Sequence, residues 1–345
     1  MRRVRIDRAG GYERLRLETA PNPVPARGEI AIRAHAVGVN FADCIVRMGL
    51  YESAKKYVGW PITPGFEVAG EVCAVGEGAT RFSVGDRVFA VTRFGGYASH
   101  VAVPERQAFA LPEGWSMAEA AGFPSVFLTA YYALFELAHP RPGARILVHS
   151  AAGGVGCAAL QLCRAAGLRA VGVVGRASKI DTAMAMGAEH VVDKSHGDLW
   201  RTLERIAPGG FDVVLDANGP ETLRASYKHL RPTGKLVIYG FHTMFRRGAG
   251  RPSLAKLAIG WLKTPRFDPL ALTGDNKSVM AFNLSYLFDE VAVLEQGMGA
   301  LLERVAKEEL TPLPVTTYRM EDVARAHRAL ESGDTVGKLV LLPDA

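Results

Sequence analysis

The pattern of apolar and polar positions changes character near residue 144. Beyond that point, short apolar runs alternate with segments whose apolar residues recur at helical spacing. Five runs have the length of buried strands and lie at residues 145–149, 170–174, 190–193, 212–216 and 235–240. A sixth strand is predicted at residues 281–287. This alternation predicts the α/β class, with a doubly wound parallel sheet.

The first part of the chain, up to about residue 122, has a different pattern. Short strand-like runs at residues 30–38, 70–76, 85–91 and 96–103 are separated by glycine and proline turns, as in a β-rich, barrel-like domain. Residues 118–137 and 289–310 are expected to be helical. A final strand, helix and strand, within residues 314–345, are expected to fold back onto the first domain. We therefore predict two domains, one formed by residues 1–122 and 290–345 and the other by residues 123–289.

The junction after the run 145–149 carries a phosphate-binding pattern. Small residues, SAAGGVG at 150–156, separate this strand from an apolar helix that ends at Gly167. Such a junction directs free backbone N–H groups at a phosphate, although a tight turn is the simpler alternative because strict G-x-G-x-x-G spacing is absent. A complete strand–helix–strand unit surrounds the junction, which favours dinucleotide binding. The predicted contacts are Ser150, Gly153, Gly154, Val155 and Gly156.

The residues after the second strand bear on the choice between NAD and NADP. An acidic residue there would hold the ribose 2′-hydroxyl, whereas a basic one accommodates the 2′-phosphate. The chain has Arg176, Ser178 and Lys179 and no acid, which favours NADPH. The alternative is that these residues only begin a solvated helix.

Charge and cysteine usage narrow the classes of function. The net charge of +6 equals the surplus of one segment, residues 241–267, which holds six cations and no acid, so a diffuse nucleic-acid surface is not expected. The four cysteines form no CxxC pair, and no signal peptide or membrane-spanning stretch is recognised, which favours the cytoplasm. The surrounding insert, residues 241–276, contains an amphipathic helix near 253–263. It could form a lid, a subunit contact, a packed helix or weak contact with an anionic membrane surface.

Five motifs occur in order along the chain: VNFAD at 39–43, PGFEVAG at 64–70, VGEG at 75–78, VGDRV at 84–88 and AAGGVG at 151–156. Together they resemble the medium-chain dehydrogenase/reductase superfamily, in particular its zinc-independent quinone oxidoreductase branch and the vesicle amine transport protein-like subgroup. The resemblance implies a Rossmann domain and a GroES-like domain, NADPH as cofactor and a homodimer.

The resemblance also implies the roles of individual residues. Asn40, Asp43 and Tyr51 are expected at the catalytic site, with Asn40 near the nicotinamide and the other two beside the substrate. Each has a simpler alternative, since Asn40 could cap a turn, Asp43 could cap a helix or pair with an arginine, and Tyr51 could only form the pocket wall. Further cofactor contacts are implied for Thr129, Gly240, Phe241, Phe282, Leu284 and Lys338.

Zinc enzymes of the superfamily have a cysteine where this chain has Asn40 and a histidine where it has Phe66. Neither replacement can serve as a tetrahedral zinc ligand, so no metal is expected. The chemistry that remains is hydride transfer from NADPH to a small quinone or α,β-unsaturated carbonyl. Two alternatives stay open: a membrane-associated NADP-binding adaptor with little turnover, and an enoyl-thioester reductase.

Overall fold

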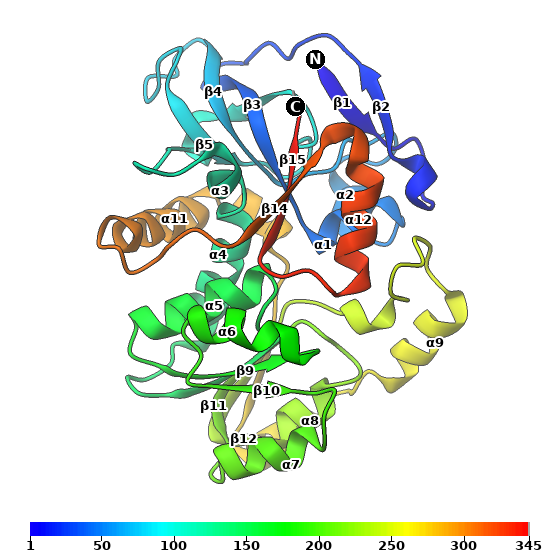
Figure 1. Ribbon diagram of the computed structural model, residues 1–345, viewed down its shortest axis with the longest axis vertical. Helices are drawn as coiled ribbons and strands as arrows, with labels where there is room; N and C mark the ends of the chain where they lie inside the picture. Colours follow the sequence, from blue (N-terminus) through cyan, green and yellow to red (C-terminus); the bar gives the residue numbers. More distant parts are fainter. Residues whose placement is uncertain (344–345) are drawn as a thin grey trace.

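The computed structural model describes residues 1–343 and has two domains built on separate sheets (Figure 1). The parallel-sheet domain contains six strands in the order β10-β9-β8-β11-β12-β13, and every neighbouring pair is parallel. The strands are β8 (Arg145–His149), β9 (Arg169–Val174), β10 (His190–Asp193), β11 (Phe211–Asp216), β12 (Leu230–Ile238) and β13 (Ser278–Ala281). The helices between them are α5 (Gly154–Ala165), α6 (Ile180–Ala185), α7 (Leu199–Ile206) and α8 (Leu223–Lys228).

Burial explains why the strands of this domain read as continuous apolar runs. Central strands of a parallel sheet are covered on both faces, so they gain nothing from alternation. In β8, Ile146, Leu147 and Val148 are all fully buried, and they divide between the cores on the two sides of the sheet. The α/β class and the five strand positions predicted from the sequence are confirmed.

The barrel domain is built on a seven-stranded sheet of order β14-β15-β3-β4-β5-β7, with β6 paired to β3. Its strands are β3 (Glu29–Val39), β4 (Glu67–Val75), β5 (Arg87–Val91), β6 (His100–Pro104), β7 (Ala108–Ala110), β14 (Val315–Arg319) and β15 (Lys338–Leu342). A separate hairpin joins β1 (Arg2–Arg5) to β2 (Arg16–Thr19). Three helices, α1 (Phe41–Arg47), α2 (Glu52–Tyr57) and α12 (Val323–Ser332), complete this domain. The last strand pairs antiparallel with β3, so the C-terminal segment does return to the first domain, as predicted.

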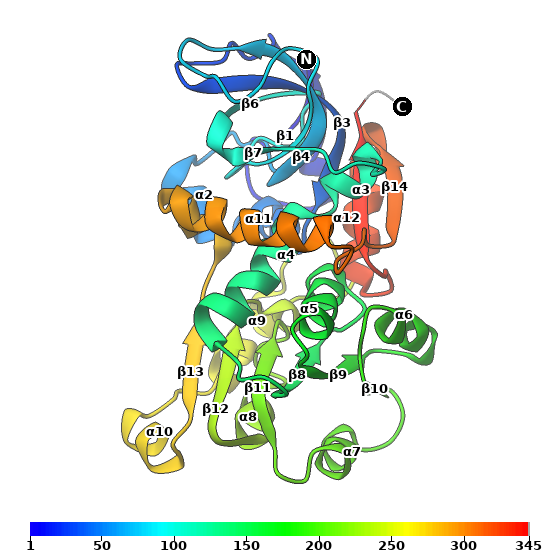
Figure 2. The same ribbon diagram turned by 90° about the vertical axis from the view of Figure 1, so that its left-hand side faces the viewer.

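Helices connect the two domains. α3 (Met117–Ala121) and α4 (Pro124–Tyr131) lead from one sheet to the other, and a π-helical segment, Tyr132–Ala138, continues α4. α11 (Val291–Ala306) lies across α4 where the domains meet (Figure 2). Among residues 1–343, no helix is both long enough and apolar enough to span a membrane.

The predicted strand at 281–287 is wrong in its position. β13 ends at Ala281, and Leu284–Asp289 instead forms a 3-10 helix whose N-cap, Asn283, accepts a hydrogen bond from the Ser285 N–H. Its apolar residues, Leu284, Leu287 and Phe288, pack against the main core. A short apolar run has the same composition in either conformation, so periodicity could not separate them.

The insert contains two helices, α9 (Leu254–Lys263) and α10 (Pro269–Asp275). Side-chain caps begin both helices, because the Ser253 hydroxyl accepts from the Lys256 N–H and Asp268 accepts from the Leu270 N–H. The expected amphipathic helix is therefore present. It lies at the right-hand side of the molecule in Figure 1.

Candidate active site

One large cleft, with a volume of about 1,010 Å³, is lined by residues of both domains. It borders the carboxyl ends of β8, β9, β11 and β12, which is where open parallel sheets bind ligands. All but three of the predicted site residues line it: Asn40, Tyr51, Thr129, Ser150, Gly153, Gly154, Val155, Gly156, Lys179, Gly240, Phe241, Phe282, Leu284 and Lys338. The three that do not are Asp43, Arg176 and Ser178.

The small-residue junction between β8 and α5 forms one wall of this cleft. Ser150 has a positive φ of 55°, and its hydroxyl donates to Asn218 Oδ1 at 3.0 Å. The helix begins at Gly154 without a side-chain cap, so its first N–H groups are left for a ligand. A Cβ on Gly156 would lie 2.4 Å from the Ser150 carbonyl oxygen, so only glycine lets the helix pack this close. This geometry fits a pyrophosphate.

A buried carboxylate shapes the loop that faces the junction. Asp216, at the end of β11, accepts hydrogen bonds from the Asn218 and Gly219 N–H groups and from the hydroxyls of Thr222 and Ser226. His149 lies beside this network, with Nε2 3.0 Å from the Ser226 hydroxyl, and burial lowers its pKa. His149 is therefore neutral at pH 7 and has a structural role in this network.

The basic end of the cleft differs from the prediction. Arg176 turns away to an exposed ion pair with Asp334, and Ser178 is exposed outside the cleft. Lys179 does face the cleft, but its ammonium group donates to the carbonyls of Gly333 and Thr335, both at 2.7 Å. Lys194, which follows β10, also lines the cleft and was not predicted. Burial, together with neighbouring cations, lowers the pKa of both lysines.

The cleft floor is held by a buried ion pair. Lys338 lies 2.6 Å from Glu67 and donates to Asn40 Oδ1 at 2.5 Å. The Asn40 amide donates to the same carboxylate at 2.8 Å, and the Ser125 N–H donates to its other oxygen at 2.7 Å. Asn40 is thereby held in one orientation at the cleft surface. Thr129 stands one helical turn beyond Ser125 and donates its hydroxyl proton to the Ser125 carbonyl.

The prediction that Asp43 lies beside the substrate is wrong, because its side chain is completely buried behind the cleft wall. One carboxylate oxygen accepts from the Asn40 N–H and the Tyr97 hydroxyl, and the other from the Gly65 N–H. Asp43 therefore caps the start of α1 and fixes the glycine loop before β4. This is the capping role weighed as the alternative.

Aromatic and aliphatic side chains line the cleft on the barrel-domain side. Of these, Tyr51 and Phe66 line the cleft, and they contact each other and Phe94 edge-on or tilted, with ring centroids 5.3–6.4 Å apart. The Tyr51 hydroxyl donates to Asn283 Oδ1 at 2.8 Å, and burial raises the pKa of this phenol. Phe245 of the insert contacts Phe41 across the cleft, with centroids 5.9 Å apart. The result is a largely apolar pocket with the Tyr51 phenol and the Asn283 amide at its wall.

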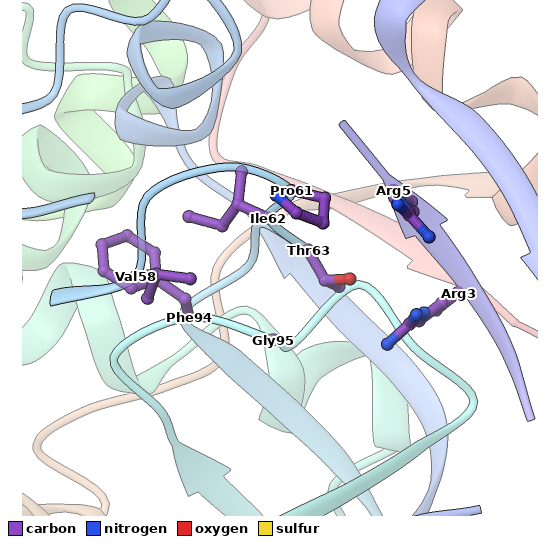
Figure 3. Close-up of a pocket in the computed structure, with 8 residues that line it drawn as sticks. All are labelled: Arg3, Arg5, Val58, Pro61, Ile62, Thr63, Phe94 and Gly95. Atoms are coloured by element: carbon purple, nitrogen blue, oxygen red, sulfur yellow. The ribbon is translucent and has the colours of Figure 1, made fainter. Parts of the chain in front are cut away.

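A second cavity, of about 330 Å³, lies on the barrel domain between the first strand and the 58–63 loop (Figure 3). Its two arginines already form ion pairs within the protein, Arg3 with Glu18 and Arg5 with Asp7. None of its lining residues belongs to the glycine-rich junction.

Comparison with known proteins places this geometry in a family. Residues 26–113 match an alcohol dehydrogenase GroES-like domain, and residues 186–341 match a family described as zinc-binding dehydrogenase. A Rattus norvegicus protein, synaptic vesicle membrane protein VAT-1 homolog, is 36% identical over 336 residues, covering 97% of this chain and 82% of its own. The chain belongs to the medium-chain dehydrogenase/reductase superfamily. It is an oxidoreductase-family chain with a GroES-like N-terminal domain and a Rossmann-like sheet.

Solved structures of the superfamily superpose over the whole chain. Escherichia coli quinone oxidoreductase complexed with NADPH has a TM-score of 0.85 and 29% identity, and covers 99% of this chain and 100% of its own. The CurK enoyl reductase also has a TM-score of 0.85, with 26% identity, and covers 99% of this chain and 98% of its own. The motifs shared with the family include the glycine-rich junction and two residues of the cleft floor, Asn40 and Glu67. They gave no signal for Lys194, which lies outside these short motifs.

Proposed function

We propose that this protein is a zinc-independent, NADPH-dependent reductase that transfers hydride to a quinone or an α,β-unsaturated carbonyl compound. The observation that carries the proposal is the single cleft in which an uncapped, glycine-rich helix start adjoins an aromatic pocket. Asn40 and Phe66 stand where zinc enzymes of the superfamily have ligands, and neither can bind zinc. Conjugated acceptors suit such a site because they need no Lewis acid.

The residues of the cleft fit NADPH. The first N–H groups of α5 would bind the pyrophosphate, and Gly153 and Gly156 allow its close approach. Lys179 and Lys194 would face the 2′-phosphate, whose place follows the second strand of the unit. Asn40, Thr129, Gly240, Phe241, Phe282 and Leu284 would surround the nicotinamide.

NADPH would supply the hydride, and the protein would supply orientation, a dry pocket and one hydrogen bond. The Tyr51 hydroxyl is held at the pocket wall by Asn283, and its raised pKa keeps it protonated at pH 7. To act on the acceptor, it would turn its one hydroxyl proton from Asn283 Oδ1 to the acceptor oxygen on which negative charge develops. Because a phenol with a raised pKa is a poor acid, water would deliver the proton that completes reduction.

The acceptor class is tested by NADPH consumption with small quinones, enones and enoyl-thioesters. We expect turnover with the first two classes. Fast turnover with enoyl-thioesters alone would favour the enoyl-thioester reductase, an alternative supported by the similarity to the CurK enoyl reductase. Tyr51→Phe is expected to lower kcat about 10- to 100-fold, the cost of one transition-state hydrogen bond. An unchanged kcat would remove Tyr51 from the mechanism.

Cofactor choice is tested by dissociation constants for NADPH and NADH. Lys194→Ala should weaken NADPH binding about 10- to 100-fold, because a hydrogen bond to a charged group contributes about 1.5–3 kcal/mol. Arg176→Ala is the matched control, since it removes the same charge from outside the cleft. Equal affinity of the wild-type protein for both cofactors would contradict the proposal.

A second candidate function rests on the surface of α9. Leu254, Trp261 and Leu262 expose 80%, 64% and 74% of their areas, and the segment 241–267 around them holds six cations and no acid. Such a surface suits anionic lipid and favours the NADP-binding, membrane-associated adaptor. Co-sedimentation with phosphatidylserine vesicles should weaken as salt rises and should fall with Trp261→Ser. Met184→Ser, on exposed α6, is the control; equal effects of both variants would exclude an α9 contact.

We also propose that the protein is located in the cytoplasm and forms a homodimer. The four cysteines are free thiols, which suits a reducing compartment. Light scattering on the purified protein tests the dimer, and a single mass near 37.1 kDa would exclude it.

A further inference from the structure

The insert follows β12 of the parallel-sheet domain, but hydrogen bonds attach it to the barrel domain. The Gly248 N–H donates to the Glu331 carbonyl at 3.2 Å, and the Gly250 N–H donates to the Glu331 carboxylate at 3.1 Å. Arg47 donates to the Gly250 carbonyl at 2.9 Å. Because Glu331 lies on α12 and Arg47 on α1, residues 248–250 connect the parallel-sheet domain to the barrel domain across the cleft.

The fastening point is a buried clamp, which we define as Arg47 and Glu331. Their charged groups lie 2.6 Å apart, and both side chains are almost wholly buried. The Tyr12 hydroxyl donates to Glu331 at 2.8 Å, while its ring packs 4.4 Å from the Arg47 guanidinium carbon. Removing one member of such a buried pair strongly lowers the stability of the fold, so we expect the clamp to keep one geometry.

The clamp does not form a metal site. The donor atoms of Cys44, His327 and Glu331 lie within 4.8 Å of one another, which is close enough for a shared ion. However, the Arg47 guanidinium already lies against this group, 3.1 Å from His327 Nδ1 and 2.6 Å from Glu331. The Arg47 guanidinium therefore neutralises the Glu331 carboxylate, in the position that a metal ion would need.

Arg247 stands immediately before the clamped residues and lines the basic end of the cleft. Its charge contributes to lowering the pKa of Lys179 and of Lys194, so Arg247 lies close enough to act on both lysines. Two acids act in the opposite direction: Asp334 raises the pKa of Lys179, and Glu221 raises that of Lys194. Within residues 1–343, the Arg247 guanidinium has no hydrogen-bond or ion-pair partner, which leaves all its donors available to an anion.

We propose that Arg247 binds the 2′-phosphate of NADPH and that the Arg47–Glu331 clamp on the opposite domain positions it there. This inference rests on the proposed function and adds a residue of the insert to the choice of cofactor. A guanidinium with no protein partner suits phosphate because it can donate two parallel hydrogen bonds. Preference for NADPH would then depend on the insert being fastened across the cleft.

The role of Arg247 is tested by binding of NADPH and NADH to Arg247→Ala. NADPH affinity should fall about 10- to 100-fold, the loss of a charge-assisted hydrogen bond, and NADH affinity should stay within about twofold. Lys263→Ala is the matched control, because it removes a cation of the same insert that does not line the cleft. An unchanged NADPH-to-NADH ratio in Arg247→Ala would overturn the inference.

The clamp is tested by two glycine variants. Gly250 and Gly248 both have positive φ, but only at Gly250 would a Cβ meet the Tyr12 ring, at 2.5 Å, whereas Gly248 has open space. Gly250→Ala should therefore lower the NADPH-to-NADH preference more than Gly248→Ala. Adding Arg247→Ala to Gly250→Ala should cause little further loss, since both changes act through one contact. Full additivity would show that the clamp does not position Arg247.

If Gly250→Ala does not fold, Tyr12→Phe weakens the same clamp by one hydrogen bond and should shift the preference in the same direction. A merely structural role would weaken binding of both cofactors equally. The two proposals also fail differently. A wild-type protein without preference for NADPH contradicts the proposed function, whereas a preference that survives Arg247→Ala contradicts only this inference.

Discussion

Replacing Lys338 by methionine is expected to destabilise the protein strongly, because the buried Glu67 carboxylate would lose the cation that is paired with it. The Glu67 side chain is fully buried, and Lys338 lies 2.6 Å from it. At an effective dielectric constant of about 20, unit charges about 4 Å apart attract by about 4 kcal/mol. Removal of one member of a buried pair costs about 3–5 kcal/mol. The two hydrogen bonds that Asn40 and Ser125 donate to Glu67 remain, so we expect about 3 kcal/mol, the lower end of this range.

Urea denaturation, followed by circular dichroism and tryptophan fluorescence, measures this loss as a change in the free energy of unfolding. The double variant Glu67→Gln with Lys338→Met removes both charges and should regain at least half of the stability. A loss below about 1 kcal/mol for Lys338→Met would be that of an exposed pair and would refute the reasoning. Strict additivity of the two changes would refute it as well.

Three further predictions concern the glycine junction, Asp43 and the thiols. Gly156→Ala should abolish cofactor binding in a titration, because its Cβ would meet backbone at 2.4 Å, while Gly153→Ala, whose nearest contact is 3.3 Å, should reduce it only moderately; equal effects would contradict the geometry. Burial raises the pKa of Asp43 to about 7, above about 3.9 in an unfolded chain, so the folded state keeps this proton longer and stability falls as pH rises between these values. Asp43→Asn should flatten that dependence in urea denaturation between pH 4 and 7, and an unchanged slope would argue against it. Native thiol labelling at pH 8 should modify only the exposed Cys73, since burial raises the pKa of Cys157 and Cys163 to about 12 and that of Cys44 also rises; rapid labelling of Cys73→Ser would disprove this.

The sequence predicts this fold well because each strand of the parallel sheet carries its own local signal. The run 145–149 is apolar, short and followed by small residues, and no distant contact is needed to interpret it. The segment 281–287 carries an equally apolar run, yet it forms the end of a strand and a 3-10 helix at the cleft. There the tertiary environment, rather than the local pattern, determined the conformation.

The candidate site could be predicted only where its residues are neighbours in the chain. Gly153 and Gly156 act together within one turn, and the sequence places them correctly in the cleft. Arg176 and Asp43 have motif positions that suggest ligand contacts, but distant partners, Asp334 and Tyr97, draw them elsewhere. Lys194 belongs to no motif. It reaches the cleft only because β10 pairs with β9 in the sheet, which the local sequence does not reveal.

The place of β15 in its sheet has a consequence for synthesis on the ribosome. This strand lies between β14 and β3, so residues near 340 complete a sheet begun near residue 30. The six strands of the other sheet lie between residues 145 and 281 and can assemble as soon as they emerge. Until translation reaches Leu342, one edge of β3 is open to pairing with strands of neighbouring nascent chains. Shortening the chain by its last strand should therefore promote aggregation more than it impairs the assembly of the nucleotide-binding half.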